Sequence, residues 1–308
     1  MKYFSDITNV NLSNTIVTVG VFDGIHLGHR AILNRMNDTK TSCGGEIVVI
    51  TFNPHPREVI EGNGLRFNYI NSKGRKVHIM ANLGVDVLID IPFTPKLSMM
   101  SSYDFLNEYI INHLHPSHIV VGYDCHFGHD DFSTMELLSA ESKKWGYKVI
   151  QVPPYMYDGQ IVSSSLIRKA LNVGDVETAN KMLGYEYNIY GQVIYGQQIG
   201  RTMGFPTANL FLENDMKLIT ANGVYACRVK WHGNMYIGMC NIGFRPTVDG
   251  KEVTIEVNIF DFDEEIYGEN ICVFFCKRMR DEVKFNGLEN LKKQLETDRE
   301  EIRRYFAQ

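Results

Sequence analysis

Long hydrophobic runs are missing from this 308-residue sequence, and no apolar stretch approaches the roughly 18 residues that a membrane span requires. The first residues, Met1–Asp6, lack the apolar core of a signal peptide. Six cysteines are present without a C-x-x-C pair, which argues against a zinc site, and a chain of this length needs no disulfides. We therefore expect a cytoplasmic protein with reduced thiols and no membrane partner.

An excess of positive charge is also missing. The 31 Lys and Arg residues are mixed with 36 Asp and Glu residues and leave a net charge of -5. A nucleic-acid-binding surface would need a basic stripe, so we expect no nucleic acid partner. The hydrophobic content of 44% is ample for a core, and the length predicts two domains. Nothing in the sequence indicates an obligate protein partner.

A strand, a tight turn and a helix follow one another near the start of the chain. An apolar, β-branched run predicts a strand over Ile16–Phe22. Asp23 and Gly24 then predict a turn, because glycine reaches φ > 0 without strain and aspartate hydrogen-bonds its own backbone. A helix is expected to begin near His26 and to continue towards Asn37. Its first backbone N–H groups and its dipole would attract an anion.

Two histidines lie at the start of that helix. His26 and His29 are three residues apart and therefore share one helix face. Together with Gly24 and Gly28, they predict a phosphate-binding site. The alternative is a core strand followed by two helix-capping histidines, but such a pair needs neither glycine.

Further strands and helices alternate along the first half of the chain. Apolar runs predict strands over Glu46–Phe52, Val85–Ile91, His118–Val121 and Tyr147–Val152. Helical spacing predicts helices over Leu65–Asn82, Tyr103–Leu114 and Phe132–Trp145. This alternation forms βαβ units, so we expect a doubly wound parallel sheet of the α/β class.

Polar residues follow two of these strands, at the sheet edge where α/β proteins bind their ligands. The flanking prolines force an extended exit from one strand and turn Asn53 and His55 outward. Asp124 follows another strand in a loop bounded by Gly122 and Gly128, where it would be placed to meet a ribose or a base. The alternatives are a turn residue fixed by its prolines for His55 and an ordinary turn aspartate for Asp124.

Serines begin a further helix. Ser163 and Ser164 can cap it and offer hydroxyl and amide groups to an anion, and Arg168 lies one turn further on, able to fork onto a phosphate. Alone this pattern is an ordinary helix N-cap, and only the phosphate site upstream favours the binding alternative. One more helix is expected over Asp175–Leu183.

The composition changes at Gly184–Asn188. Alternating β-branched, aromatic and turn residues then predict strands over Tyr187–Ile194, Val224–Val229, Met235–Ile242, Val253–Ile259 and Ile271–Lys277. Short strands at this spacing are typical of a small β-barrel. One amphipathic helix, Leu288–Phe306, closes the chain.

A loop rich in glycine, Gly196–Asn209, lies after the first of these strands. Its glycines let backbone amides approach phosphates closely, and Thr207 and Asn209 offer oxygen ligands suited to Mg²⁺. It is not a Walker A loop, because its glycine spacing is shorter and Arg201 replaces the lysine. The alternative is a plain glycine-rich hairpin.

One acidic residue interrupts an apolar strand. Glu256 lies between Ile255 and Val257, which face the opposite side. Its carboxylate is either on a solvated strand face, which the pattern alone favours, or a positioned base. The acidic run Asp261–Glu265 is expected to be a solvated turn rather than a metal site.

In their order along nearly the whole chain, these motifs resemble those of the prokaryotic bifunctional riboflavin kinase/FAD synthetase family. Segments 20–29, 51–56 and 163–168 resemble its adenylyltransferase module, which belongs to the nucleotidyltransferase superfamily. Segments 200–209, 223–226, 241–247 and 256–262 resemble its riboflavin kinase module. The resemblance implies an adenylyltransferase domain over 1–184, followed by a six-stranded β-barrel kinase domain with a C-terminal helix over 185–308.

The resemblance also implies two reactions. The second domain would phosphorylate riboflavin with ATP to give FMN, and the first would join FMN to the AMP part of a second ATP, giving FAD and pyrophosphate. Mg²⁺ would accompany ATP at Thr207 and Asn209, and Arg280 would help to hold the flavin. The residues implied to be catalytic are His26, His29 and Glu256. Those implied to bind nucleotide are Phe22, Asp23, Gly24, Gly28, Asn53, His55, Asp124, Ser163, Ser164, Arg168, Gly200, Arg201 and Pro206.

Some positions depart from the family pattern. Cys125 and His126 stand where relatives usually carry Phe and Arg, and Leu166 stands where many carry arginine. Asn258 replaces a common histidine beside Glu256. Two other functions therefore stay open: a riboflavin kinase with weak or lost adenylyltransferase activity, and a non-catalytic flavin-binding regulator.

Overall fold

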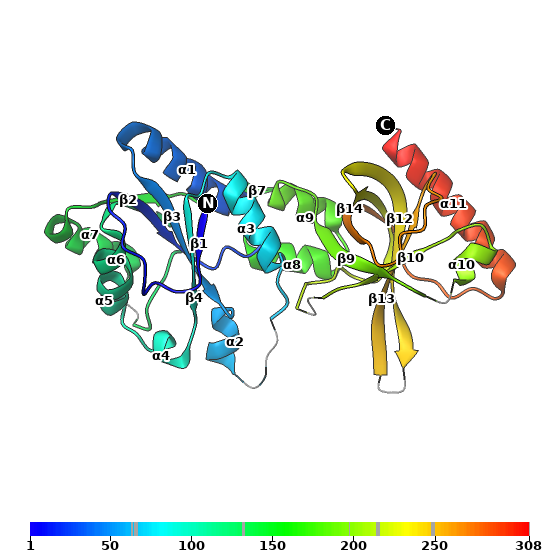
Figure 1. Ribbon diagram of the computed structural model, residues 1–308, viewed down its shortest axis with the longest axis horizontal. Helices are drawn as coiled ribbons and strands as arrows, with labels where there is room; N and C mark the ends of the chain where they lie inside the picture. Colours follow the sequence, from blue (N-terminus) through cyan, green and yellow to red (C-terminus); the bar gives the residue numbers. More distant parts are fainter. Residues whose placement is uncertain are drawn as a thin grey trace. The chain divides into compact units, whose positions relative to one another are not determined.

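The computed structural model describes residues 1–62, 64, 67–130, 133–196, 198–213, 216–247 and 250–307. The chain divides into two compact units, Met1–Ser164 and Ser165–Gln308 (Figure 1). Each unit has its own sheet and its own hydrophobic core.

The first unit is built on a sheet of six strands in the order β1-β4-β3-β2-β5-β6. These strands are β1 (Lys2–Phe4), β2 (Thr15–Val19), β3 (Glu46–Asn53), β4 (Val87–Pro92), β5 (Pro116–Gly122) and β6 (Lys148–Val152). Every neighbouring pair is parallel, so the predicted α/β class and parallel sheet are confirmed. The three-residue β1 was not predicted, because so short a strand has no readable pattern.

Helices connect these strands. They are α1 (Leu27–Cys43), α2 (Pro56–Glu61), α3 (Lys73–Asn82), α4 (Pro95–Ser98), α5 (Ser102–Phe105), the π-helix η1 (Leu106–Ile111), α6 (Asn112–Leu114) and α7 (Thr134–Trp145). The expected helix over Tyr103–Leu114 is therefore a continuous α5-η1-α6 run. After β6, the short strands β7 (Met156–Tyr157) and β8 (Gln160–Ile161) pair as a hairpin.

The helix predicted over Leu65–Asn82 is wrong in its first part. Its start at Leu65 lies outside the described residues, as does Phe132, where another helix was expected to begin. The helix α3 begins only at Lys73, with the Ser72 side chain accepting a hydrogen bond from a backbone N–H of its first turn. The segment before α3 is not helical, because the backbone N–H groups of Ile70 and Asn71 donate hydrogen bonds to the Asp23 side chain instead of to helix carbonyls.

The strand order places a crevice beside the end of β2. From β2 the chain continues to β3 and β4 on one side, and β5 then returns to pair with the other side of β2. In open α/β sheets, ligands bind outside the carboxyl ends of the strands at such a reversal. The loops after β2 and β5 therefore meet at the predicted ligand edge.

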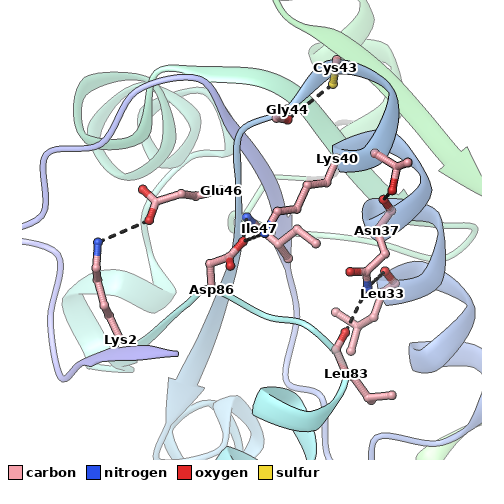
Figure 2. Close-up of polar contacts among 11 residues, drawn as sticks. Lys2, Leu33, Asn37, Lys40, Cys43, Gly44, Glu46, Ile47, Leu83 and Asp86 are labelled. Carbon is pink, nitrogen blue, oxygen red and sulfur yellow. Dashed lines mark hydrogen bonds and ion pairs between the residues drawn. The ribbon is translucent and has the colours of Figure 1, made fainter.

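Polar contacts fix the helix α1 against this sheet (Figure 2). Lys40 forms an ion pair of 2.6 Å with Asp86, whose carboxylate also accepts the backbone N–H of Ile47 on β3. The Asn37 side-chain amide donates to the carbonyl oxygens of Leu33 and Leu83, each at 2.9 Å. The helix is thus held by its later turns, and its N-terminus is presented at the end of β2.

The second unit contains a closed antiparallel barrel in the order β10-β13-β12-β11-β14-β9. Its strands are β9 (Asn188–Ile194), β10 (Ala208–Phe211), β11 (Gly223–Trp231), β12 (Asn234–Thr247), β13 (Gly250–Ile259) and β14 (Asn270–Arg280). Its helices are α8 (Ser164–Asn172), α9 (Val176–Leu183), α10 (Ile199–Thr202) and α11 (Leu288–Phe306). The predicted six-stranded barrel and C-terminal helix are confirmed, although β10 begins within the segment expected to be a glycine-rich loop.

The barrel strands are buried on both faces over part of their length. Val224 and Ala226 of β11 pack in one cluster with Ile302 of α11, so they lie on the outer face. Tyr225 and Cys227, between and beyond them, are fully buried and point inward. The outer face beneath α11 is therefore a second apolar layer.

Candidate active sites

The two histidines of the first unit lie at the start of α1 as predicted. His26 is the N-cap residue, and its Nδ1 accepts the backbone N–H of His29 at 3.4 Å. The two imidazole rings are stacked, with centroids 3.7 Å apart. Phe22 lies in the turn before them with φ of 51°, and its ring centroid is 4.9 Å from that of His29. The turn is thus held in a conformation that bulky residues rarely adopt.

Burial keeps both rings uncharged at neutral pH. It lowers the pKa of His26 to about 4. The pKa of His29 also lies well below its ordinary value, mainly because of burial and further because of nearby His26 and Lys76. Because His26 Nδ1 accepts a hydrogen bond, the proton of its neutral ring lies on Nε2, which can donate. The buried Nδ1 of His29 has no hydrogen-bond partner among the described residues.

Asp23 supports the turn from within. Its side chain is buried, and its carboxylate accepts the backbone N–H groups of Ile70, at 3.0 Å, and of Asn71. The Ser164 hydroxyl donates to the Asp23 carbonyl oxygen at 2.8 Å. Gly24 has φ of 84°, as the predicted turn requires. A contact of the Asp23 carboxylate with nucleotide stays a prediction.

Gly28 leaves room for the histidine rings. A Cβ at this position would lie 3.1 Å from atoms of the His26 ring and 3.5 Å from the carbonyl oxygen of Val162. A larger residue at position 28 would therefore crowd the His26 ring. The predicted contact of Gly28 with a nucleotide stays a prediction.

A cavity of about 440 Å³ opens beside this helix start. It brings together Phe22 and His29 from the first loop and Asp124 from the loop after β5. Cys125 and His126, which depart from the family pattern, also line it. Four further aromatic residues form part of its wall, namely Phe52, Phe93, Phe105 and Phe127. Sequence reasoning missed these four because an apolar residue in a cavity wall has the same sequence pattern as any core residue.

His55 and Asn53 do not line this cavity, whereas Pro56 does. His55 is the N-cap of α2, and it forms a capping box with Glu58. Its ring stacks on Phe67 with centroids 3.6 Å apart. His55 therefore fixes the start of a helix, as its alternative interpretation expected, and its ring packs on a buried aromatic side chain, while its role in binding stays a prediction.

The remaining predicted residues of the first site lie in the segment that begins α8. Ser163 and Ser164 belong to the first unit, and the Ser164 hydroxyl binds the turn at Phe22–Gly24, named the phosphate turn here after the phosphate site predicted beside it. Arg168 lies on α8 in the second unit.

A row of paired residues crosses the barrel at Glu256. Asn209 of β10 and Asn241 of β12 lie directly opposite it on either side, and Val224 of β11 pairs with Asn241. Directly paired residues point to the same face of a sheet, so Glu256 lies on the outer face that α11 partly covers. Glu256 is half-buried there, and its neighbours Ile255 and Val257 are buried on the inner face as expected.

Two cavities adjoin this row and share Thr207. One, of about 310 Å³, is lined by Glu256, Asn241 and Arg280 together with apolar residues of α11. The other, of about 380 Å³, is lined by Arg201 and Pro206 and by the acidic turn, through Asp263, Glu264 and Glu265. That turn is exposed, as predicted, but it also forms the rim of a cavity.

Glycines shape the loop between the two cavities. A Cβ on Gly196 would lie 2.2 Å from Nδ2 of Asn209, and one on Gly200 would lie 2.2 Å from the carbonyl oxygen of Phe205. Gly200 therefore excludes a side chain, because the close atom belongs to the backbone, and Gly196 leaves the space that the Asn209 amide fills.

Arg280 is held by an acidic residue that sequence reasoning missed. Its Nη2 lies 2.7 Å from Oδ2 of Asp298 on α11, and its Nε donates to the same carboxylate. The Asp298 side chain is 2% exposed and also accepts a hydrogen bond from Gln294. An aspartate on a helix with charged neighbours gave no sequence signal of a buried partner.

In the part of the chain that the structure describes, no group of three or more His, Cys, Asp or Glu side chains could hold a metal ion. No helix among the described residues is both long and apolar enough to cross a membrane. All six cysteines are free thiols.

Comparisons with known proteins agree with this geometry. The family model described as FAD synthetase matches residues 8–166, and the model described as riboflavin kinase matches residues 183–306. The bifunctional riboflavin kinase/FMN adenylyltransferase of Bacillus subtilis is 37% identical over 299 residues, which cover 96% of this chain and 93% of that protein. The protein of the same name from Escherichia coli K12 is 30% identical over 311 residues, covering 100% and 98%.

One solved structure is also similar over the full length. It is described as a macrolide-efflux protein from Streptococcus pneumoniae, has a TM-score of 0.90 and 33% identity, and the match covers 98% of both chains. Both family models and the curated relatives agree over nearly the whole chain, and the chain belongs to the bifunctional riboflavin kinase/FMN adenylyltransferase family.

Proposed function

We propose that this chain phosphorylates riboflavin to FMN in its barrel and converts FMN to FAD in its α/β unit, using one ATP for each step. The observation that carries the proposal is the pairing of Asn209, Glu256 and Asn241 in one row beneath α11, beside two cavities that share Thr207. Family membership supports both reactions.

In the kinase reaction, the 5′-hydroxyl of riboflavin attacks the γ-phosphorus of ATP, whose bond to the β,γ-bridging oxygen breaks, so that ADP leaves. An alcohol is a poor nucleophile at neutral pH, so a carboxylate within reach can take its proton, and we assign that role to Glu256. The cavity that holds Glu256 and Arg280 would take the flavin, and the cavity lined by Arg201 and Pro206 would take ATP with Gly200. Thr207 lies at their junction, where the phosphate would pass.

Mg²⁺ fits the donors found at that junction. The Thr207 hydroxyl and the Asn209 amide oxygen are hard ligands, and the lack of a side chain on Gly196 leaves room for the amide. Two neutral oxygen ligands alone would bind Mg²⁺ weakly, so the ion would arrive bound to the phosphates of ATP. When bound, it would neutralise charge on the phosphates that react.

In the adenylyltransferase reaction, a phosphate oxygen of FMN attacks the α-phosphorus of ATP. The nucleophile is already an anion, so this site needs no general base. Among the described residues that line its cavity, only Asp124 carries a carboxylate. The Nε2 proton of neutral His26 and the first N–H groups of α1 can instead stabilise charge on the phosphates. His29 lies in the cavity wall beside Phe22 and would align the same phosphates.

The other predicted contacts complete the proposal. Asp124 would bind the ribose or base of ATP, since it lines the cavity that His29 lines. We further propose that four more residues contribute to this site, namely Asn53, His55, Ser163 and Arg168.

We also propose that the adenylyltransferase domain ends at residue 184 and the kinase domain begins at residue 185. The free thiols favour a cytoplasmic protein.

A single time course tests both reactions. Purified protein is incubated with riboflavin, ATP and Mg²⁺, and riboflavin, FMN and FAD are separated chromatographically at intervals. We expect FMN to form first and FAD to follow. Formation of neither product would overturn the proposal.

Cys125 and His126 support a second candidate, a kinase with weak adenylyltransferase activity. Both line the cavity of the first unit, where the family usually places larger or charged side chains. Incubation with FMN, ATP and Mg²⁺ separates the two candidates, because only the bifunctional enzyme makes FAD at a rate comparable to FMN formation. A protein that binds flavin but forms no product would instead be a regulator.

A further inference from the structure

A lysine is buried beneath the phosphate turn of the first unit. Lys76, on α3, is only 8% exposed, and its Nζ donates hydrogen bonds to two oxygens that carry no charge. In the described part of the chain, no carboxylate forms an ion pair with it. An ammonium group loses much hydration on burial, which costs free energy. A lysine that is buried without an ionic partner is therefore expected to serve a function that outweighs this cost.

The contacts of Lys76 join the ends of two strands. Its Nζ donates to the carbonyl oxygen of Val21 at 2.8 Å and to the hydroxyl of Thr51, near the end of β3, at 3.3 Å. The Thr51 hydroxyl donates to the same Val21 carbonyl at 3.0 Å. Val21 lines the cavity and directly precedes Phe22, where the backbone enters the positive-φ turn. Lys76 therefore fixes Val21, the residue directly before the phosphate turn.

The charge of Lys76 also reaches the site. Burial lowers the pKa of Lys76, while Asp23 in the turn and Asp90 on β4 raise it and Lys73 on the same helix lowers it. The ammonium group in turn contributes to the low pKa of His29. A positive charge shielded from water acts over a longer distance than one at the surface.

We propose that Lys76 is a positioning residue for adenylyl transfer, which fixes the Val21 carbonyl under the phosphate turn and places a buried positive charge beneath the bound phosphates. This inference rests on the proposed FAD-forming activity of the first unit. Lys76 would touch neither the phosphate of FMN nor the α-phosphate of ATP, which are the groups that react.

The test compares two lysines of the same helix. Lys76→Met removes the charge and keeps the length of the side chain, and Lys73→Met is the control, because Lys73 is 57% exposed and pairs with Asp90 at 3.0 Å. We expect Lys76→Met to lower kcat/KM for FAD formation from FMN by about tenfold or more, and Lys73→Met to lower it less than about threefold. Riboflavin phosphorylation by the barrel serves as an internal standard and stays unchanged in both variants.

Two further readouts separate charge from packing. Loss of the ammonium group raises the His29 pKa, so the acid side of the pH profile of FAD formation moves to higher pH in Lys76→Met. It stays in place in Lys76→Arg, which also recovers part of the rate. Calorimetric titration with ATP requires no turnover, and we expect the Kd to rise by about tenfold in Lys76→Met.

Several results would overturn the proposal. An ATP affinity and an FAD rate in Lys76→Met equal to those of Lys73→Met would do so, as would a slow Lys76→Met enzyme whose pH profile is unshifted. If Lys76→Met does not fold, Lys76→Arg decides: a folded Arg variant without FAD activity contradicts the role of the charge. Absence of FAD formation by the unaltered protein would count against the proposed function, whereas the ATP titration still tests Lys76.

Discussion

Arg280 of β14 and Asp298 of α11 form a two-pronged ion pair that fastens the C-terminal helix to the rim of the cavity that holds Glu256. The carboxylate is almost fully buried, and the guanidinium also donates to the carbonyl oxygen of Asp281. The helix therefore does more than cover the barrel, since it fixes the direction of a side chain proposed to hold the flavin.

Asp298→Ala should weaken both the barrel and its flavin site. Breaking a buried pair by removing one partner leaves a buried charge, which costs about 3 kcal/mol in the free energy of unfolding. We expect a lower Tm of the barrel and a raised KM for riboflavin, with FAD formation from supplied FMN unchanged. The control is Asp281→Ala, because the Asp281 side chain is 78% exposed in its pair with Arg278. A KM for riboflavin equal to that of the control would contradict the positioning of Arg280 by Asp298.

Glu256→Ala should abolish FMN formation while FAD formation from FMN continues. Loss of a general base slows proton transfer by at least about a hundredfold, and the adenylyltransferase chemistry needs no such base. The two rates are measured separately on one preparation, with exposed Glu296→Ala as the control. Loss of both activities together would show that the two sites are not independent.

His29→Ala should have the opposite effect. Removal of one group that stabilises or aligns the reacting phosphates slows FAD formation by about a hundredfold, whereas riboflavin phosphorylation proceeds at the normal rate. The exposed His78 gives a matched histidine control in the same unit. An unchanged rate of FAD formation would rule out the role assigned to His29.

The stability of the first unit should fall as the pH is lowered from about 6.5 to about 4. Burial lowers the pKa of folded His26 to about 4, so over this range the unfolded chain binds a proton that the folded chain does not. The contribution of His26 to the free energy of unfolding is therefore fully present above about pH 6.5, the pKa of His26 in the unfolded chain. It falls by on the order of 3 kcal/mol as the pH approaches the pKa of about 4 in the folded chain.

Urea unfolding at several pH values measures this loss. The chain has two tryptophans, Trp145 in the first unit and Trp231 in the second, so a Trp231→Phe background makes fluorescence report on the first unit alone. His26→Asn keeps a helix-capping side chain and removes the titrating ring. An equally steep acid loss in His26→Asn would mean that another group causes it.

Local pattern was enough for much of the fold. The C-terminal helix has the bounds predicted from its apolar spacing, Leu288–Phe306. The turn at Asp23-Gly24 and the helix that starts at His26 were also readable, because turn chemistry and helix capping depend on neighbours in sequence. The helix expected from Leu65 failed because Asp23, 47 positions before Ile70, binds the backbone there.

The sequence by itself determined the order of strands and helices, the two glycine-rich loops and the chemical types gathered in them, because these follow from residues near one another in the chain. Only the tertiary structure decided which of those residues are buried and what they face. Glu256 has a solvent-side pattern, yet the pairing of β13 with its neighbours and the cover of α11 place it in a cavity. Lys76 and Asp298 have the pattern of helix surface residues, yet both are buried by elements distant in sequence. Burial and electrostatic coupling depend on such distant packing, and no local pattern encodes them.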